Sequence, residues 1–265
     1  MDLGLRDKVV VVTGASQGIG LAVTRAFSEE GARVVAGARH SSPELDALGA
    51  GAAVVPVAVD LGAPEGPAAL VERAVESFGG LDVLVNNLGT GAVRTSFLSI
   101  TDEEWQRSFD MNLFSAVRAS RAALPALIER GGGAIVNLAS VNSFLPDPSV
   151  VDYCAAKAAL LNLSKALSME FGPKGVRVNA VAPGPVRTPF WVGPGGVAEK
   201  IAAAAGTDFE GALRVAAAGW GGLALDNFFT EPEEVATLVL LLASERLGNV
   251  TGSAYVTDGG LLKTT

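Results

Sequence analysis

The chain has 265 residues, of which 49% are hydrophobic and 18% are charged. This apolar content can offset the entropy of ordering the chain, which excludes intrinsic disorder and allows a large buried core. The formal net charge of −8 argues against nucleic-acid binding, which needs a concentrated basic face. One cysteine, Cys154, and one histidine, His40, exclude an intrachain disulfide and a thiolate or multi-histidine metal site, so we expect no metal.

The amino terminus predicts neither secretion nor membrane insertion. Residues 1–8 carry too many charges for a signal peptide, and no run of about 18 uncharged, mostly apolar residues occurs along the chain. We therefore expect a cytoplasmic protein without a membrane span.

Apolar runs typical of buried parallel strands alternate with segments of helical periodicity. The predicted strands are Lys8–Thr13, Arg33–Ala38, Val54–Val59, Val83–Asn86, Ala134–Ala139, Val176–Val181 and Ser253–Val256. The predicted helices are Ile19–Glu30, Ala68–Phe78, Asp102–Ala123, Val151–Phe171 and Glu233–Ala243. This alternation implies right-handed crossovers and an α/β fold. We predict one domain, residues 1–265, with a Rossmann-type doubly wound parallel sheet and helices on both faces.

One long segment, Thr188–Phe229, fits neither pattern and reads as irregular. It is rich in glycine and alanine. Long segments of this kind inside a compact domain are usually functional. We therefore predict a small substrate-side lobe or lid here, with a pair of packing helices as the alternative.

A glycine-rich turn follows the first predicted strand and opens the first predicted helix. From Thr13 to Gly20 it reads Thr-Gly-Ala-Ser-Gln-Gly-Ile-Gly. Glycines let a pyrophosphate approach the backbone, and the helix N-terminus offers free N–H groups to the anion. We expect phosphate contacts from Gly14, Ser16, Gln17, Gly18, Ile19 and Gly20. An ordinary turn is the alternative, but the position between a strand and a helix favours a dinucleotide site.

The spacing of these glycines, TGxxxGxG, resembles that of the short-chain dehydrogenase/reductase family. The fourth predicted strand leads into Asn86-Asn87-Leu88-Gly89, which resembles the family's Asn-Asn-Ala-Gly motif with leucine in place of alanine. The resemblance continues in the family's order and spacing through Asn112, Ser140, Tyr153, Lys157 and the pair Pro183-Gly184. It implies a dinucleotide-dependent oxidoreductase in which Asn87 and Gly89 lie beside the cofactor.

The end of the second predicted strand indicates which dinucleotide binds. An acidic residue there would accept hydrogen bonds from the adenosine ribose and repel a 2′-phosphate. This chain has Ala38 followed by Arg39, whose guanidinium can pair with a 2′-phosphate. We therefore predict NADP(H). The alternatives are NAD and an Arg39 that is only a solvated loop charge.

Further residues are expected on the adenosine side of the site. His40 stacks there or lies in solvent, and Ser41 and Ser42 offer hydroxyl donors. Asp60 resembles the family aspartate that receives the adenine amino group, with Leu61 beside it. A helix N-cap is the alternative role for Asp60.

Tyr153 and Lys157 lie four residues apart on a predicted helix and therefore share one face. Ser140 follows the fifth strand, at the edge where open parallel sheets bind ligands. Carbonyl reduction needs a proton at oxygen, and a phenol with an ordinary pKa of about 10 is a poor proton shuttle near neutrality. We expect the Lys157 ammonium to lower the pKa of Tyr153, and Ser140 to stabilise the developing alkoxide. Ser143 is the runner-up to Ser140.

The family resemblance implies further roles. It implies that Lys157 also binds the nicotinamide ribose and that Asn112 holds a water in the proton relay. A helix-distorting polar residue is the alternative for Asn112. The turn after the sixth strand would cradle the nicotinamide carboxamide through Pro183, Gly184, Val186 and Thr188. An N-cap is the alternative for Thr188.

Together these patterns predict an NADP(H)-dependent oxidoreductase that interconverts a ketone and a secondary alcohol. An apolar or aromatic, polyketide-like ketone is favoured by Phe144, Leu145, Phe190, Trp191, Trp220, Phe228 and Phe229. Four alternatives remain open: an NAD-dependent alcohol or hydroxysteroid-type dehydrogenase, a 3-oxoacyl-thioester reductase, a redox-neutral dehydratase or epimerase, and a dinucleotide-binding regulatory protein. By analogy with the family, the long helices and the last strand predict a homotetramer or homodimer.

Overall fold

The computed structural model describes residues 2–219 and 229–263. Its centre is a seven-stranded sheet in the order β3-β2-β1-β4-β5-β6-β7, in which every pairing is parallel. The strands are β1 Val9–Thr13, β2 Arg33–Ala38, β3 Val54–Ala58, β4 Val83–Asn86, β5 Gly133–Leu138, β6 Val176–Pro183 and β7 Ala254–Thr257. The predicted doubly wound Rossmann-type sheet is confirmed, and strand ends move by one or two residues from their predicted positions.

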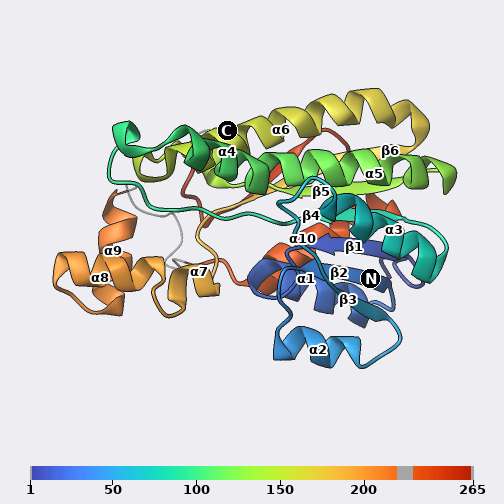
Figure 1. Cartoon of the computed structure of the whole chain (residues 1–265), viewed down its shortest axis with the longest axis horizontal. Helices are drawn as coiled ribbons and strands as arrows, with labels where there is room; N and C mark the ends of the chain where they lie inside the picture. Colours follow the sequence, from blue (N-terminus) through green and yellow to red (C-terminus); the bar gives the residue numbers. More distant parts are fainter. Residues whose placement is uncertain (1, 220–228, 264–265) are drawn as a thin grey trace.

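Helices cover both faces of the sheet (Figure 1). They are α1 Gly18–Glu29, α2 Pro43–Gly49, α3 Gly66–Phe78, α4 Asp102–Phe109, α5 Ser115–Glu129, α6 Val151–Phe171, α7 Pro189–Val192, α8 Val197–Ala205, α9 Phe209–Gly219 and α10 Pro232–Ala243. Helices α1 and α10 pack on one face, and α3, α5 and α6 pack on the other. The strands are therefore buried on both sides, which explains why β1 and β4 are almost entirely apolar.

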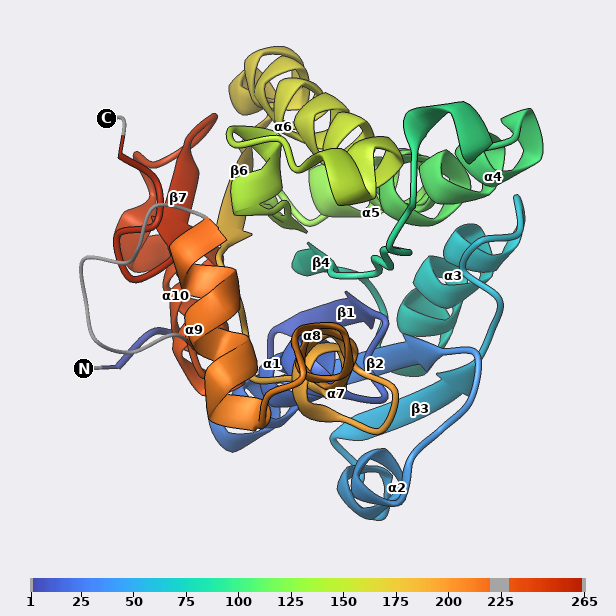
Figure 2. The same cartoon turned by 90° about the vertical axis from the view of Figure 1, so that its left-hand side faces the viewer.

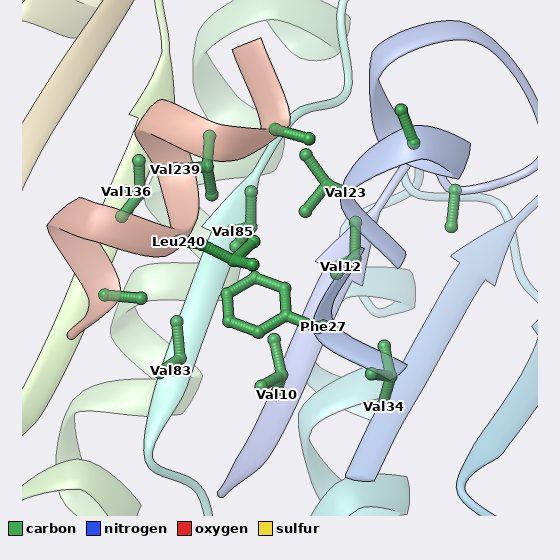
Figure 3. Packing of buried hydrophobic residues seen from close by; sticks show 14 of the residues in the cluster. Val10, Val12, Val23, Phe27, Val34, Val83, Val85, Val136, Val239 and Leu240 are labelled. Carbon is green, nitrogen blue, oxygen red and sulfur yellow. The ribbon is translucent and has the colours of Figure 1, made fainter. Parts of the chain in front are cut away.

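The core beneath α1 and α10 is built around one aromatic side chain. Phe27 of α1 is fully buried, and Figure 3 shows its ring among valines of β1 and β4 and Leu240 of α10. Valine is suited to these positions because its β-branched side chain packs well on a pleated surface. This packing fixes α1, and hence the glycine-rich turn that opens it, against the sheet.

The predicted helix Asp102–Ala123 is wrong as a single continuous element. Helix α4 ends at Phe109, the chain makes a π-helical turn over Asp110–Phe114, and α5 then runs through Pro125 to Glu129. Inside the π-helical turn, Asn112 Nδ2 donates to the Ser108 carbonyl at 2.9 Å. A polar side chain that bonds the backbone in this way accompanies the distortion of the helix.

The segment predicted as irregular is largely helical where it is described, which corrects the sequence analysis. It forms α7, α8 and α9, which Figure 1 shows set apart from the layers that cover the sheet and Figure 2 shows in front of the strands. The lobe has a small core of its own, in which Trp191 and Phe229 pack at a ring separation of 5.7 Å. Helices therefore replace the predicted irregular chain, whereas the role of a substrate-side lobe stays a prediction. Trp220 and Phe228 lie outside the described residues.

Among the described residues, no helix combines the length and the apolar character that a membrane span requires.

Truncation of the central aromatic side chain tests the packing. Phe27→Ala should lower the free energy of unfolding by about 3–5 kcal/mol, because it removes buried contacts and leaves a cavity. Urea titration at a fixed protein concentration measures this loss. Leu98, which is 90% exposed, provides the control, and Leu98→Ala should change stability by less than about 0.5 kcal/mol. Equal losses in the two variants would contradict the position of Phe27.

Candidate active site

A cavity of about 1530 Å³ opens at the carboxyl ends of the strands. The chain runs from β1 to β2 and β3 on one side and continues with β4 on the other side of β1. Such a reversal of strand order is where open parallel sheets bind ligands. Every residue predicted to contact the cofactor or to act in catalysis lines this cavity, with the exception of Asn112 and of Ser143, the runner-up to Ser140.

The glycine-rich turn forms one end of the cavity. Gly14 and Gly18 have positive φ angles of 68° and 55°, which favour glycine. A Cβ on Gly20 would collide with the Gly14 carbonyl oxygen, and a Cβ on Gly18 would lie 3.0 Å from Cγ2 of Thr188. Gln17 precedes α1 without a side-chain cap, so the first N–H groups of the helix are available to an anion.

Side chains of the neighbouring turns hold this glycine turn in place. Asn87 Nδ2 donates to the carbonyl oxygens of Thr13 and Gly14 at 2.9 and 3.0 Å. The Thr13 hydroxyl in turn accepts from the backbone N–H groups of Asn87 and Leu88 at 2.9 and 3.0 Å. The side chain predicted to contact the cofactor at Asn87 therefore also organises the turn around it.

The adenosine end of the cavity carries the predicted basic side chain. Arg39 and His40 are exposed there, and Arg39 makes no ion pair with any residue that the structure describes. The expected hydroxyl donors have partners within the chain, because Ser41 donates to Asp46 at 2.5 Å and the Ser42 hydroxyl caps α2.

Asp60 and Leu61 also line the adenosine end. Asp60 Oδ1 accepts from the Gly62 backbone N–H at 3.0 Å, whereas Glu65 occupies the N-cap position of α3. The N-cap alternative for Asp60 is therefore wrong.

The proposed proton-transfer residues converge on the other end of the cavity. Tyr153 and Lys157 lie one turn apart on α6, with the Lys157 ammonium 5.7 Å from the centre of the Tyr153 ring. Ser140 follows β5 and is hydrogen-bonded to Tyr153. Ser143, the runner-up, does not line the cavity.

The pKa of Tyr153 differs from the sequence-based expectation. Burial raises this pKa above its ordinary value, and the hydrogen bond with Ser140 only partly opposes the rise. The Lys157 ammonium donates to the Leu138 carbonyl oxygen at 2.7 Å and is not among the groups that shift the pKa of Tyr153. The expectation that Lys157 lowers this pKa is therefore wrong for the structure, in which the phenol is held in its protonated form.

Asn112 is buried behind the cavity and does not line it. Its Nδ2 donates to the Thr90 and Ser108 carbonyls at 2.8 and 2.9 Å, and its Oδ1 accepts from the Thr90 N–H at 2.9 Å. The side chain thus holds the turn after β4 in place, as the helix-distorting alternative describes. Gly89 in this turn is close to Lys157, since a Cβ there would lie 3.0 Å from Nζ.

A buried ion pair near Tyr153 escaped the sequence analysis. Arg94 donates to Asp152 at 2.7 Å and to Glu104 at 2.6 Å, and its backbone N–H donates to the Ser149 carbonyl at 2.7 Å. The two carboxylates raise the pKa of Arg94. Because Asp152 is 1% exposed and directly precedes Tyr153, this pair braces the turn after β4 against the start of α6.

The turn after β6 completes the nicotinamide end. Pro183, Gly184, Val186 and Thr188 all line the cavity. A Cβ on Gly184 would lie 2.9 Å from Asp258, so this position needs glycine. Thr188 occupies the N-cap position of α7, but its side chain makes no capping hydrogen bond.

The predicted apolar residues divide into two groups at the substrate end. Leu145, Phe190 and Trp191 line the cavity, together with Val93 and Ile201, which the sequence analysis did not single out. Phe144 and Phe229 do not line it, which corrects the expectation for both, since Phe229 is buried in the core of the lobe.

Comparison with known proteins agrees with this fold. The sequence matches the family model for short chain dehydrogenase over residues 8–193. A crystal structure of L-sorbose reductase from Gluconobacter frateurii, complexed with NADPH and L-sorbose, has a TM-score of 0.91 and 40% identity, with 100% of both chains covered. The 3beta-hydroxysteroid dehydrogenase 1 of Eggerthella lenta is 38% identical over 97% of this chain and 94% of its own. A 3-oxoacyl-(acyl-carrier-protein) reductase of Thermotoga maritima is 34% identical over 97% and 99%.

The chain belongs to the short-chain dehydrogenase/reductase family. It is an oxidoreductase that acts on alcohol or ketone groups, and its family binds a nicotinamide dinucleotide. The cavity fits such a group, because the glycine turn keeps its backbone open and the uncapped start of α1 can receive phosphate.

The buried charge of Lys157 should appear in the pH dependence of stability. Its pKa is lowered by burial from 10.5 to about 8. Between these values the unfolded chain binds more protons, so the contribution of this group to stability rises with pH there. Below about pH 8 Lys157 is protonated in both the folded and the unfolded chain, and the cost of burying its charge is largest.

Lys157→Met removes this titration and serves as the reference. From about pH 7.5 to about pH 10, the wild-type protein should gain about 2 kcal/mol of unfolding free energy relative to the variant. Urea titrations at the two pH values measure the difference. Parallel pH dependences in the two proteins would contradict a lowered pKa.

Proposed function

We propose that the protein is an NADP(H)-dependent oxidoreductase that interconverts a ketone and a secondary alcohol. The observation that carries this proposal is the convergence of Tyr153, Ser140 and Lys157 in one cavity, with Arg39 at its far end. The span of the cavity, from the adenosine end to the substrate end, suits an extended dinucleotide with a substrate beside it.

The choice of NADP(H) rests on Arg39. Its guanidinium is exposed in the cavity, and no acidic residue stands at the end of β2 to repel a phosphate. L-sorbose reductase, whose structure was determined with NADPH bound, is similar along its whole length. Asp60 and Leu61 flank the adenine in this proposal, and His40 lies beside the adenosine.

The chemistry follows from the state of the three side chains. When bound, the nicotinamide supplies the hydride for reduction or accepts it for oxidation. The protonated phenol of Tyr153 donates a proton to the substrate oxygen, and the Ser140 hydroxyl stabilises the charge that develops on this oxygen. The Lys157 ammonium, held at the Leu138 carbonyl one turn along α6 from Tyr153, binds the nicotinamide ribose in this proposal.

The remaining predicted residues position the dinucleotide. Gly184, Val186 and Thr188 offer backbone and hydroxyl groups next to Pro183, at the nicotinamide end. Asn112 acts through Thr90 and Gly89 in this account, and a water held for a proton relay stays a prediction. The described part of the segment Thr188–Phe229 forms the proposed substrate-side lobe of a single domain, residues 1–265.

An apolar or aromatic ketone is the substrate class that we propose. Leu145, Phe190, Trp191 and Ile201 come from different segments and together give this end an apolar wall. A polyhydroxylated ketone is the second candidate, because the similar L-sorbose reductase was crystallised with L-sorbose.

We further propose a cytoplasmic homotetramer or homodimer, in which the faces of α5 and α6 and the edge strand β7 form the contacts.

Removal of the phenol hydroxyl tests the proposed proton donor. Tyr153→Phe should lower kcat for ketone reduction by about 10²–10⁴-fold and leave NADPH binding, measured by fluorescence, unchanged. Tyr255→Phe, at the second tyrosine of the chain, serves as the control and should keep full turnover. Persistent turnover in Tyr153→Phe would contradict the assignment.

The wild-type protein itself tests the alternative classes. NADPH binding without turnover of any ketone would favour a regulatory protein, and turnover of substrate without net NADPH consumption would favour a redox-neutral enzyme.

Cofactor selectivity should depend on Arg39. Arg39→Ala should raise the KM for NADPH by about 10–100-fold, the worth of a charge-assisted hydrogen bond, and change the KM for NADH little. Arg25→Ala removes the same charge from an exposed site outside the cavity and provides the control. Equal changes in both KM values would indicate that Arg39 is a solvated charge and that the enzyme does not select for the 2′-phosphate.

A further inference from the structure

The wall of the cavity beside Tyr153 carries two polar side chains that take no part in the proposed reaction or in cofactor binding. Asn142 and Asp147 belong to the turn between β5 and α6, and both line the cavity together with Ser140. Leu145 lies between them in the sequence and lines the same wall. This wall therefore combines hydrogen-bonding groups with an apolar surface next to Ser140 and Tyr153, which bind the reacting carbonyl in the proposed function.

The buried thiol of Cys154 orients Asn142. Asn142 Nδ2 donates to Cys154 Sγ at 3.4 Å, and the Asp147 backbone N–H donates to the same sulfur at 3.3 Å. The thiol itself donates to the Asp147 carbonyl oxygen at 3.6 Å. One of the two N–H groups of the Asn142 amide is engaged in this way, and the acceptor Oδ1, which has no partner among the described residues, is available to a ligand.

Asp147 adds a second acceptor. Its Oδ1 accepts from the Ser149 backbone N–H at 2.8 Å and from the Ser149 hydroxyl at 2.7 Å, which fixes the carboxylate. Oδ2 accepts no hydrogen bond from the residues that the structure describes. Between positions 140 and 150 the cavity wall includes no lysine or arginine, and the nearby Lys157 ammonium is engaged by the Leu138 carbonyl, so an anionic substrate group here would meet the Asp147 carboxylate unfavourably.

We propose that Asn142 and Asp147 form a subsite for a substrate hydroxyl group adjacent to the carbonyl carbon. The preferred substrates are then α-hydroxy ketones with an apolar body, and the corresponding products are vicinal diols. This inference rests on the proposed function, because Ser140 and Tyr153 must bind the carbonyl oxygen for the neighbouring carbon to face this wall. The Asp147 carboxylate can only accept hydrogen bonds, so together with Asn142 Oδ1 it selects a group that donates, which a hydroxyl group does and an ether or a carboxylate does not.

Three ketones that differ in one group test the subsite: acetophenone, 2-hydroxyacetophenone and 2-methoxyacetophenone, each reduced with NADPH. The methoxy compound has a similar electronic effect on the carbonyl but lacks a hydrogen-bond donor. The wild-type protein should show a kcat/KM for the hydroxy ketone about tenfold or more above that for the methoxy ketone, the worth of one or two hydrogen bonds. A ratio near one would overturn this inference while leaving the proposed function intact. Absence of NADPH consumption with all three ketones would overturn the reductase proposal for this substrate class and this inference with it.

Variants test whether Asn142 and the Cys154 thiol that orients it cause the preference, measured as the ratio of kcat/KM for the hydroxy ketone to that for the methoxy ketone. Asn142→Leu keeps the size of the side chain without an acceptor and should bring the hydroxy-to-methoxy ratio close to one. Cys154→Ala should lower the ratio by releasing the Asn142 amide, and Cys154→Ser, which keeps a hydrogen-bonding group, should restore most of it. Ser143→Ala, in the same turn but outside the cavity, is the control and should keep the wild-type ratio. Because each ratio is measured within one protein sample, partial unfolding of a variant cancels. A wild-type ratio in Asn142→Leu would overturn the assignment.

Discussion

The hydrogen bond between the Lys157 ammonium and the Leu138 carbonyl is the contact on which the arrangement of the site depends. A buried ammonium is costly unless it is paired, so this contact is strongly constrained. It ties α6, which carries Tyr153, to the end of β5, which is followed by Ser140. One contact thereby sets the distance between the proposed proton donor and the group that stabilises the developing charge.

The turn after β4 must fit closely around this buried charge. Gly89 approaches Lys157 so closely that a Cβ would be tightly placed. Asn112, in the π-helical turn between α4 and α5, hydrogen-bonds to this turn. Arg94, which follows the turn in the chain, is paired with Asp152 of α6. Distortion of the helix and burial of an ion pair both have an energetic cost. Both features act on one short segment that forms a wall of the cavity.

The parts that the sequence predicted well are those with a local signal. The strands follow from apolar runs, the glycine turn from its position between a strand and a helix, and the shared face of Tyr153 and Lys157 from a spacing of four residues. The helices of the lobe were missed, since α7 and α8 are short and are separated by the glycines of residues 193–196. The π-helical turn was missed because an apolar pattern does not reveal one extra residue in a helical turn.

Contacts between distant segments had no sequence signal. Arg94 and Asp152 are 58 positions apart, and Asn142 reaches Cys154 across a turn. The direction of the Tyr153 pKa shift was also missed, because burial depends on the packed structure and here exceeds any effect of the neighbouring ammonium. Sequence reasoning could place the reacting side chains together, but the electrostatic balance among them required the fold.

A crystal structure of the protein with NADPH is the most direct test of the account. We expect the nicotinamide ring between Tyr153 and the turn after β6, the adenosine 2′-phosphate within hydrogen-bond distance of Arg39, and the Lys157 ammonium still in contact with the Leu138 carbonyl. A nicotinamide ring remote from the Tyr153 hydroxyl, or a Lys157 side chain displaced from Leu138 and directed away from the cavity, would contradict it.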